Sequence, residues 1–414
     1  MNILLIYPRP DKYKKPRFGF SYELLLLATI LKSYHCIKIK DYSCEEYDEQ
    51  WLVMQRKSYD LVLVECDSFA LKRSENVINA REILTIFKGN VPTIAYGNYC
   101  YIKKQNLELA DYTIYNNDIN QIIDCVNRIC KNKIVPNIPE YNQLPFVDRK
   151  ILLSIDYYRE NNKNTLLQTS KGCENTCVFC QRKGWQKHYV AHSDEYVINE
   201  LKIIKEEGYE NIWITDENFS FNLTRAKRLL KKIADEAITK NMNLFISSWA
   251  NIDNEFIDLC VKCNVKIISF GIESGSEDIL KFYRKNINLN TVPTLIEYAN
   301  SNGIFTVGNF ILGAPMESED TIEKTFNLIR KCGFDQVNIK TLDYMIGSEL
   351  YESLDEKYKV EDHVFSCAEY GLTIFKLEEL KKKKILFLQQ YYQEHKTNLA
   401  KKIMIYGQPY NINQ

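Results

Sequence analysis

The chain has 414 residues, 45% of them hydrophobic, and its 54 basic residues balance its 54 acidic ones. This length predicts two or three domains with ordinary hydrophobic cores. A net charge of zero provides no strong field for nucleic acid or an anionic membrane surface, so neither is expected as a partner.

The N-terminus and the cysteines indicate where the protein works. The first eight residues, MNILLIYP, carry no basic segment before their apolar run, which predicts a strand and not a signal peptide. No apolar run reaches membrane-spanning length. Thirteen cysteines in such a chain indicate a reducing compartment, where thiols stay free or bind metal. We therefore expect a cytoplasmic protein.

Residues 1–132 alternate short apolar runs with segments of helical periodicity. The expected strands are Ile3–Tyr7, Cys36–Lys40, Leu61–Glu65, Pro92–Ala95 and Tyr112–Tyr115, with helices near 21–33, 45–57, 72–88 and 118–131. This alternation predicts an α/β domain with a doubly wound parallel sheet, of the Rossmann type and flavodoxin-like order. Ligands of such sheets bind beyond the carboxyl ends of the strands, here after Tyr7, Glu65 and Ala95.

Residues 133–164 contain Pro136, Pro139 and Pro145 and lack periodicity, which predicts a linker. A second alternation fills 165–350, with expected helices near 194–207, 222–240, 254–263, 276–284, 290–302 and 317–332. Its expected strands are Thr165–Thr169, Asn211–Thr215, Asn243–Ser248, Lys266–Gly271, Ile304–Leu312 and Gln336–Thr341. Six strand–helix units predict a partial (β/α)6 barrel of the TIM type, with its chemistry on loops after the strands. Residues 351–414 are expected to form a short helical C-terminal region, in which Lys381–Lys384 is a solvated helix face.

The first barrel strand leads into three cysteines, Cys173, Cys177 and Cys180, with the spacing C-x3-C-x2-C. Three thiolates on one loop can hold an iron–sulfur cluster, and a four-iron cluster then keeps one iron open for a small molecule. A zinc site remains an alternative, because His188 and His192 follow and zinc takes four Cys or His ligands. The pair Cys260 and Cys263 lies in an expected helix and is interpreted as packed thiols and not as a second cluster.

The cysteine loop resembles that of the radical S-adenosylmethionine (radical SAM) superfamily. The resemblance implies that the open iron chelates SAM and that Phe179, before the last cysteine, lies near the adenine. The segment GIESG at 271–275 resembles the superfamily's G-x-E-S-G segment, whose glutamate, here Glu273, bonds the ribose hydroxyls. A carboxylate suits that role because it accepts both hydroxyl protons. Ser274 is a further candidate for SAM binding, and it or Ser276 could instead cap the next helix.

Other strand ends also resemble the superfamily. The acidic pair Asp216 and Glu217 follows the second strand, where such residues contact SAM or substrate, although loop or helix-initiating acids are equally common there. Ser248 ends the third strand, where relatives often carry an arginine. The resemblance implies that the fifth strand packs around the adenine with Phe310, Leu312 and Gly313. Residues 342–351 resemble a P-G-T-x-L-Y segment without its proline and threonine.

A doubly wound domain ahead of this barrel resembles the cobalamin-binding, class B radical SAM methyltransferases. The match is incomplete, because Ala95–Cys100 replaces a Gly-Gly-x-His segment and no D-x-H-x-x-G motif offers a lower axial histidine. Tyr99 or Cys100 could face a corrin, or the domain could serve as a scaffold or a substrate platform. Cobalamin binding therefore stays open.

The resemblance implies a [4Fe-4S] cluster that reductively cleaves SAM to a 5′-deoxyadenosyl radical, which activates a substrate C–H bond. Cobalamin-dependent C-methylation of a small-molecule or natural-product substrate is the favoured outcome, with a flavodoxin- or ferredoxin-type electron donor. Rearrangement, elimination, epimerisation or oxidation without cobalamin are alternatives, and so is a non-catalytic metal-binding scaffold. A tRNA methylthiotransferase is disfavoured, because the N-terminal cysteines Cys36, Cys44, Cys66 and Cys100 lack convincing placement for a second cluster. No residue pattern identifies the catalytic side chains or the substrate.

Overall fold

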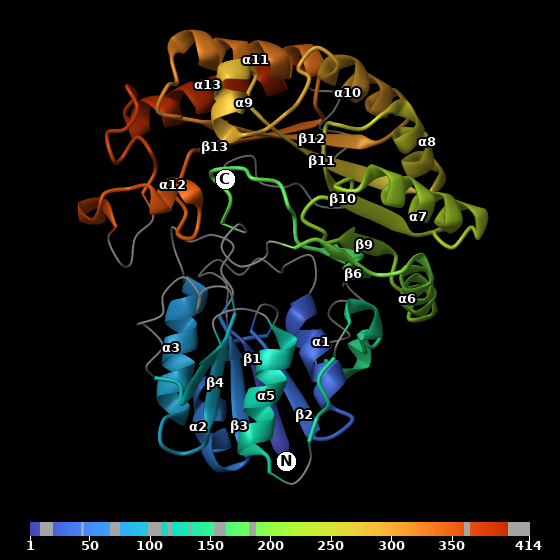
Figure 1. The fold of residues 1–414 in the computed structure, drawn as a ribbon, viewed down its shortest axis with the longest axis vertical. Helices are drawn as coiled ribbons and strands as arrows, with labels where there is room; N and C mark the ends of the chain where they lie inside the picture. The colour runs from blue at the N-terminus through green and yellow to red at the C-terminus, as the bar shows by residue number, and fades with distance from the viewer. Residues whose placement is uncertain are drawn as a thin grey trace. The chain divides into compact units, whose positions relative to one another are not determined.

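Two parallel α/β units make up the described part of the chain in the computed structural model (Figure 1). The described residues are 1–8, 20–42, 45–66, 75–97, 109–114, 118–131, 134–138, 140–152, 163–181, 188–359 and 365–395. Contacts group 1–168 with 190–211 and 361–363 as one unit, and 169–189 with 212–360 and 364–414 as the other. The domain boundaries at 132, 164 and 350 stay predictions.

The first unit contains a five-stranded parallel sheet with the order β2-β1-β3-β4-β5. Its strands are β1 (Asn2–Tyr7), β2 (Cys36–Asp41), β3 (Leu61–Glu65), β4 (Thr93–Tyr96) and β5 (Tyr112–Ile114). Its helices are α1 (Tyr22–Leu31), α2 (Glu49–Met54), α3 (Glu75–Phe87) and α5 (Ile119–Ile129). This order confirms the flavodoxin-like prediction. The strands β3 and β4 are buried throughout, as expected for the middle of a sheet covered on both faces.

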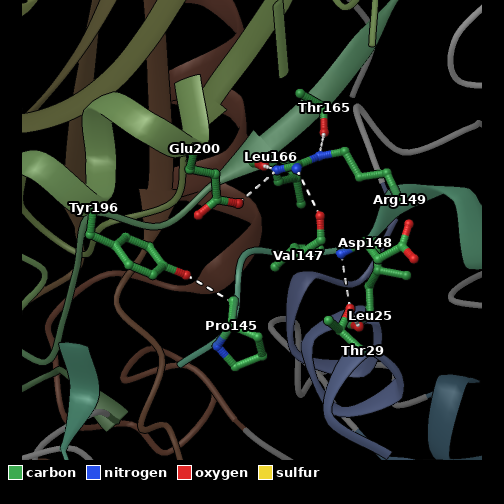
Figure 2. Close-up of polar contacts among 10 residues, drawn as sticks. All are labelled: Leu25, Thr29, Pro145, Val147, Asp148, Arg149, Thr165, Leu166, Tyr196 and Glu200. Atoms are coloured by element: carbon green, nitrogen blue, oxygen red, sulfur yellow. Dashed lines mark hydrogen bonds and ion pairs between the residues drawn. The ribbon is translucent and has the colours of Figure 1, made fainter. Parts of the chain in front are cut away.

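A buried ion pair fixes the segment between the predicted domains to the helix α6 (Asp194–Glu206) within the first unit (Figure 2). The Arg149 guanidinium donates to Glu200 Oε1 at 3.0 Å and to Thr165 Oγ1 at 2.9 Å, and neither charged side chain is solvent-exposed. It also donates to the carbonyls of Val147 and Leu166. The predicted linker is therefore anchored at Arg149 by buried polar contacts.

The larger sheet has six strands in the order β13-β12-β11-β10-β9-β6. They are β6 (Asn164–Leu167), β9 (Asn211–Ile214), β10 (Asn243–Trp249), β11 (Val265–Glu273), β12 (Phe305–Leu312) and β13 (Gln336–Thr341), and a short pair is formed by β7 (Ser170–Lys171) and β8 (Val190–Ala191). The registers of β10 to β13 are parallel. This open six-stranded sheet confirms the partial barrel.

Helices follow one another along the outside of this sheet (Figure 1). They are α7 (Leu223–Asp235), α8 (Asn254–Lys262), α9 (Glu277–Tyr283), α10 (Val292–Ser301) and α11 (Glu319–Cys332). Side chains cap several of them: Asn222 accepts from Arg225 N before α7, and Ser318 forms a capping box before α11. These caps explain why the sequence predicted the helix starts closely.

The C-terminal region contains α12 (Glu349–Glu352) and α13 (Leu377–Glu394), and 396–414 lie outside the described residues. The Phe387 ring of α13 stacks on Phe326 at 4.0 Å, and Tyr391 donates to the carbonyl of Phe334. The run Lys381–Lys384 is only partly solvated, because Lys381 and Lys382 are exposed whereas Lys383 and Lys384 are partly buried. Among the described residues, no helix is both long and apolar enough to cross a membrane.

The two faces of β10 to β13 differ in accessibility. Side chains alternate between the faces of a strand. In the later part of these strands one set of residues, including Phe270, Phe310 and Val337, is buried, whereas the alternate set is partly accessible; nearer the amino ends both sets are buried. The partly accessible residues at the middle of these strands are Ser247, Ser269, Asn309 and Asn338. We refer to this as the open face of the sheet.

Candidate functional site

Asp216, directly after β9, anchors the start of the cysteine loop. Its carboxylate accepts from the backbone N–H groups of Thr169 and Ser170 at 2.7 and 3.0 Å and from their hydroxyls at 2.5 and 2.6 Å. Burial raises the pKa of Asp216, and these four hydrogen bonds oppose that rise. Both carboxylate oxygens are thus occupied by protein, and a contact of Asp216 with SAM stays a prediction.

Glu217, Arg225 and Gly172 complete the anchoring. The Glu217 carboxylate accepts from Gly172 N at 3.0 Å, and the Arg225 guanidinium donates to the carbonyl of Thr169 at 2.8 Å. Gly172 has a φ of 87°, and a Cβ there would collide with the carbonyl oxygen of His188. The loop conformation is therefore determined by hydrogen bonds and by a position that only glycine fills easily.

The three cysteines differ in burial: Cys177 is buried, whereas Cys173 and Cys180 are partly exposed. The Asn175 amide donates to Cys173 Sγ at 3.2 Å, and Cys180 N donates to the carbonyl of Cys177. Burial raises the pKa of Cys177 to about 12, and the charges of Cys180 and Cys173 add to the rise. Because metals bind thiolates, iron binding here would release protons and relieve this repulsion.

Neither histidine considered for a zinc site is placed as its ligand by the structure. His192 is buried and stacked between Tyr141 and Tyr196, with ring centroids 3.9 and 3.8 Å apart, and His188 is exposed. Across the described ranges, no three Cys, His, Asp or Glu side chains are grouped as ligands of a single metal ion. A cluster spreads its thiolates over several irons and needs no such grouping.

Phe179 lies just before the last cysteine of the motif in sequence, and its ring packs on the end of α9. Its ring meets Tyr283 edge-on at a centroid distance of 5.1 Å. The backbone of Val178 donates to the carbonyl of Tyr283 and accepts from Leu350 N at 3.1 Å. The second half of the loop is therefore held by α9 and α12, and the role of Phe179 toward adenine stays a prediction.

Glu273 ends β11 in the left-handed region, with a φ of 73°. It accepts from Lys285 Nζ at 2.6 Å, and this ammonium also lies 4.6 Å above the centre of the Trp249 ring. The positive charge of Lys285 lowers the pKa of Cys177, which is otherwise raised mainly by burial. Glu273, Lys285 and Trp249 thus form one cluster at the carboxyl ends of β10 and β11.

Sequence reasoning missed Lys285, which follows α9 and lies far from Trp249 in the chain. No sequence pattern marked it; in the structure it follows Arg284, which takes a left-handed conformation at the end of α9. Gly271 makes room for the cluster: a Cβ there would come within 2.8 Å of both Glu273 Oε1 and Lys285 Nζ. Lys285 supplies a cation near the strand end where relatives often carry an arginine.

Ser274 and Ser248 are engaged with protein groups. Ser274 Oγ lies 3.2 Å from Thr325 Oγ1 and accepts from Ser276 N, which makes it a turn residue at the start of α9. Ser248 Oγ lies 2.6 Å from Ser220 Oγ and 2.7 Å from the carbonyl of Trp249. Both are buried, and contacts with SAM stay predictions.

The predicted adenine residues of β12 lie on its buried face. Phe310 packs edge-on against Phe334 at 5.8 Å, and Leu312 is fully buried. Gly313 has a φ of 93° and donates to the buried carboxylate of Glu317 at 3.0 Å. Alternation places Asn309, not Phe310, on the open face, a difference of one residue that the apolar strand did not reveal.

Two further groups of predicted residues lie away from this loop or outside the description. Cys260 and Cys263 are both buried, and Cys263 Sγ donates to the carbonyl of Leu230, which supports the interpretation as packed thiols. In the first unit, Glu65 at the end of β3 accepts from Ser21 Oγ at 2.8 Å. Tyr99 and Cys100, considered as residues facing a corrin, lie outside the described residues.

Comparisons with known proteins agree with this geometry. Residues 167–329 match the family model of the radical SAM superfamily. An uncharacterised methyltransferase of Pyrococcus horikoshii is 29% identical over 222 residues, which are 52% of this chain and 48% of the relative. Cytidylyl-2-hydroxyethylphosphonate methyltransferase of Streptomyces wedmorensis is 28% identical over 193 residues, 44% of this chain and 36% of the relative. The chain thus spans about half or less of the length of these relatives.

Solved structures resemble the fold across both units. The radical SAM methyltransferase TsrM from Kitasatospora setae, with cobalamin and a [4Fe-4S] cluster bound, has a TM-score of 0.71 at 16% identity. That likeness covers 84% of this chain and 76% of TsrM. The cobalamin-dependent radical SAM enzyme OxsB has a TM-score of 0.65 at 14% identity, covering 90% of this chain and 58% of OxsB. Residues 167–329 therefore form a radical SAM domain, in a chain with the fold of cobalamin-dependent radical SAM enzymes.

Proposed function

We propose that this chain is a radical SAM enzyme, and that it transfers a methyl group to carbon of a small-molecule substrate with the help of cobalamin. The proposed ligands of a [4Fe-4S] cluster are Cys173, Cys177 and Cys180. When bound, the cluster and SAM supply a 5′-deoxyadenosyl radical for the activation of a C–H bond. An external flavodoxin- or ferredoxin-type donor provides the electron, and the cytoplasm is the location we propose.

The observation that carries this proposal is the anchored cysteine loop. Asp216, Glu217 and Arg225 all bond to the segment just before or at its start, so the thiols are presented at the carboxyl edge of the sheet. A loop that serves only as a surface turn has no need of a buried carboxylate with four hydrogen bonds, because burying that charge is costly.

The chain's own groups can bind the nucleoside near this loop. Glu273 can accept two hydroxyl protons of a ribose, and Lys285 keeps its carboxylate oriented and compensates its charge. The same ammonium is available to an anionic group that approaches Trp249. We propose these two residues as the core of the SAM-binding site, with Phe179 near the adenine.

Cobalamin is proposed for the first unit on the strength of its strand order and of the fold shared with TsrM and OxsB. In a sheet of this order the ligand lies beyond the carboxyl ends of β1, β3 and β4. We assign residues 1–132 to this domain and 165–350 to the radical SAM barrel, with 133–164 between them.

A methylthiotransferase is the rival for which a specific match exists. The ribosomal protein uS12 methylthiotransferase RimO of Caldanaerobacter subterraneus is 24% identical over 325 residues. Membership of that family would imply three N-terminal cysteines that hold a second cluster. Here Cys36 lies at the amino end of β2 and Cys66 follows the carboxyl end of β3, about 15–20 Å apart along the strand direction. Cys36 and Cys66 cannot bind the same cluster, and Cys44 and Cys100 lie outside the described residues, so the preference for methylation rests on the fold shared with TsrM and OxsB.

The deciding experiment is an anaerobic absorbance spectrum with iron, zinc and cobalt analysis on protein produced with cobalamin supplied. We expect about four irons per chain with stoichiometric cobalt, and loss of the iron in Cys177→Ala. Cys36→Ala is the matched control and should retain the full content of iron and cobalt. Zinc without iron would overturn the enzyme assignment, whereas iron without cobalt would leave radical chemistry and remove methylation by cobalamin.

A further inference from the structure

A row of uncharged polar side chains crosses the open face of the larger sheet. It consists of Gln336 and Asn338 on β13, Asn309 on β12 and Ser269 on β11, and we call it the amide row. Asn309 and Asn338 lie directly opposite each other in the strand register. All four side chains are partly accessible. The interior of a closed barrel is instead filled with branched apolar side chains, so a polar and accessible row indicates a surface for a ligand.

The hydrogen bonds of the amide row fix the direction of every amide in it. Asn309 Nδ2 donates to the backbone carbonyl of Phe270 and to Ser269 Oγ, each at 2.9 Å. A backbone carbonyl can only accept, so the Asn309 oxygen must point the other way, where Asn338 Nδ2 donates to it at 3.0 Å. Gln336 Nε2 in turn donates to Asn338 Oδ1 at 3.0 Å. The chain of donors therefore runs from β13 to β11.

This arrangement keeps donors available. Ser269 Oγ accepts from Asn309, so its own proton can be given to another group. Asn338 uses one of its two amide protons on Asn309. Within the described part of the chain, neither remaining proton is donated to a protein acceptor. These two donors lie on β11 and β13, on either side of Asn309, so each can donate to an acceptor of its own on a ligand, such as a carbonyl oxygen.

The surroundings favour a neutral ligand group. The only carboxylate on β9 to β13 is Glu273, which Lys285 already pairs, and the exposed Lys340 lies two residues beyond Asn338 on β13. No cation lies within the row itself, and a carboxylate held by neutral donors alone would lose hydration that they replace incompletely. An amide or similar neutral carbonyl meets the donors at a smaller desolvation cost.

Aromatic side chains occupy the neighbouring strands. Phe245 shares the face of Ser247 by strand alternation, and the Trp213 ring lies 6.4 Å from it. Ser247 is in register with Ser269, so the aromatic pair and the amide row are neighbours on the same sheet. Phe245 is itself buried and Trp213 is partly accessible, so Trp213 is the aromatic side chain that this face offers next to the amide row.

We propose that the amide row binds a neutral carbonyl group of the substrate while a planar apolar part of the substrate lies toward Trp213. This deepens the proposed function and rests on it, because it names the chemical class of the substrate: an aromatic or other planar molecule bearing an amide-type carbonyl. Ser269 and Asn338 are its specificity-determining residues.

The test uses phenylacetamide and phenylacetate, which share ring and size and differ in charge. Ligand-observed NMR titrations on the full-length, iron-loaded protein should give an amide Kd about fivefold or more below that of the acid. Ser269→Ala and Asn338→Ala should each raise the Kd of phenylacetamide about fivefold and leave the Kd of phenylacetate nearly unchanged. Asn327→Ala, on the exposed face of α11, is the matched control, and thermal unfolding confirms that each variant folds.

Equal or tighter binding of phenylacetate, an unchanged Kd in both variants, or no binding of either probe would each overturn the proposal. Asn338→Gln should restore part of the affinity, because it returns the donor, whereas a merely structural loss would not recover. Iron content and SAM binding are measured on the same samples. Missing iron contradicts the proposed function whatever the probes do, and normal iron and SAM binding without amide preference contradicts only this inference.

Discussion

Lys285 is the residue on which the SAM-binding proposal depends most directly, since it holds Glu273 and covers the Trp249 ring. Lys285→Met should weaken SAM binding about tenfold, because a hydrogen bond between charged groups contributes about 1.5–3 kcal/mol. Calorimetric titration of SAM into iron-loaded protein measures this. Lys281→Met, which removes an exposed lysine of the preceding helix α9, should leave the Kd unchanged, and equal losses in both variants would contradict the assignment.

Two glycines on neighbouring strands should separate ligand binding from stability. In Gly271→Ala the new Cβ meets the ends of the Glu273 and Lys285 side chains at 2.8 Å, and these flexible ends can shift. We expect weaker SAM binding with a small change in the unfolding temperature. In Gly308→Ala the Cβ meets the packed rings of Phe310 and Phe334 at 2.9 Å, which should destabilise the fold by about 1–3 kcal/mol.

SAM titration and thermal unfolding on both variants check this pair of outcomes. The two glycines differ in what their Cβ would contact and not in size, so each variant is the control for the other. A Gly271→Ala protein that unfolds early but binds SAM normally would show that the cluster at the end of β11 has only a structural role.

At the scale of an element, the cysteine loop depends on Asp216 at the end of β9. Asp216→Asn replaces an acceptor of four hydrogen bonds by a group that must donate with one end, leaving at least one partner unpaired. We expect a loss of about 1–3 kcal/mol in stability and a lower iron content after reconstitution. Asp235→Asn, at the exposed end of α7, should change neither the urea midpoint nor the iron content.

The segment around Arg149 makes a second prediction at this scale, because its ion pair with Glu200 is fully buried (Figure 2). Arg149→Met should cost about 3–5 kcal/mol, since it leaves an uncompensated buried charge. Adding Glu200→Leu should recover a large part of that loss. The exposed pair of Lys163 and Glu210 is the control, and Lys163→Met should cost less than about 1 kcal/mol.

Urea unfolding of the three variants measures these differences. If Arg149→Met loses as little stability as Lys163→Met, the Glu200 carboxyl is protonated and needs no partner. Burial favours the protonated form, because it raises the pKa of Glu200. The double variant distinguishes the two cases, because replacing Glu200 restores the stability of Arg149→Met only if the Glu200 carboxyl is charged in that variant.

At the scale of the whole molecule, strand order and strand ends were predictable because hydrophobic periodicity encodes them. The β3 and β13 boundaries coincide with the predicted ones, and the order of the first sheet follows from the alternation of strands and helices. The cysteine loop was predictable for the same reason, since its residues are adjacent in sequence.

The sequence could not predict contacts between residues far apart in the chain. It also could not predict which side chains of a largely apolar strand lie on which face of the sheet. Lys285 reaches Glu273 only after α9 has turned back on the sheet. Which of Asn309 and Phe310 faces the open side depends on the pairing of β12 with its neighbours, in which Asn309 lies opposite Gly271 and Asn338. Arg149 gave no periodic signal, because it meets Glu200 across 51 residues.

The division into two units leads to a prediction about the two proposed cofactors. The cysteines belong to one unit, and the strands β1, β3 and β4 belong to the other. Each site is built from the hydrogen bonds and core of its own unit, so loss of one ligand should leave the other site intact. We therefore expect Cys177→Ala to lose iron and yet bind hydroxocobalamin with a Kd within about twofold of the unmodified protein.

An absorbance titration with hydroxocobalamin on both proteins measures this Kd. The unfolding temperature of each protein should also rise with added cobalamin, as it does for any ligand that binds only the native state. Cys36→Ala serves again as the control with intact iron. If cobalamin binding falls together with iron, the two sites share residues or are energetically coupled, and the separate assignment of the units is wrong. If neither protein binds cobalamin, the first unit has a different role and the methylation proposal fails, while the iron and SAM measurements on the second unit keep their meaning.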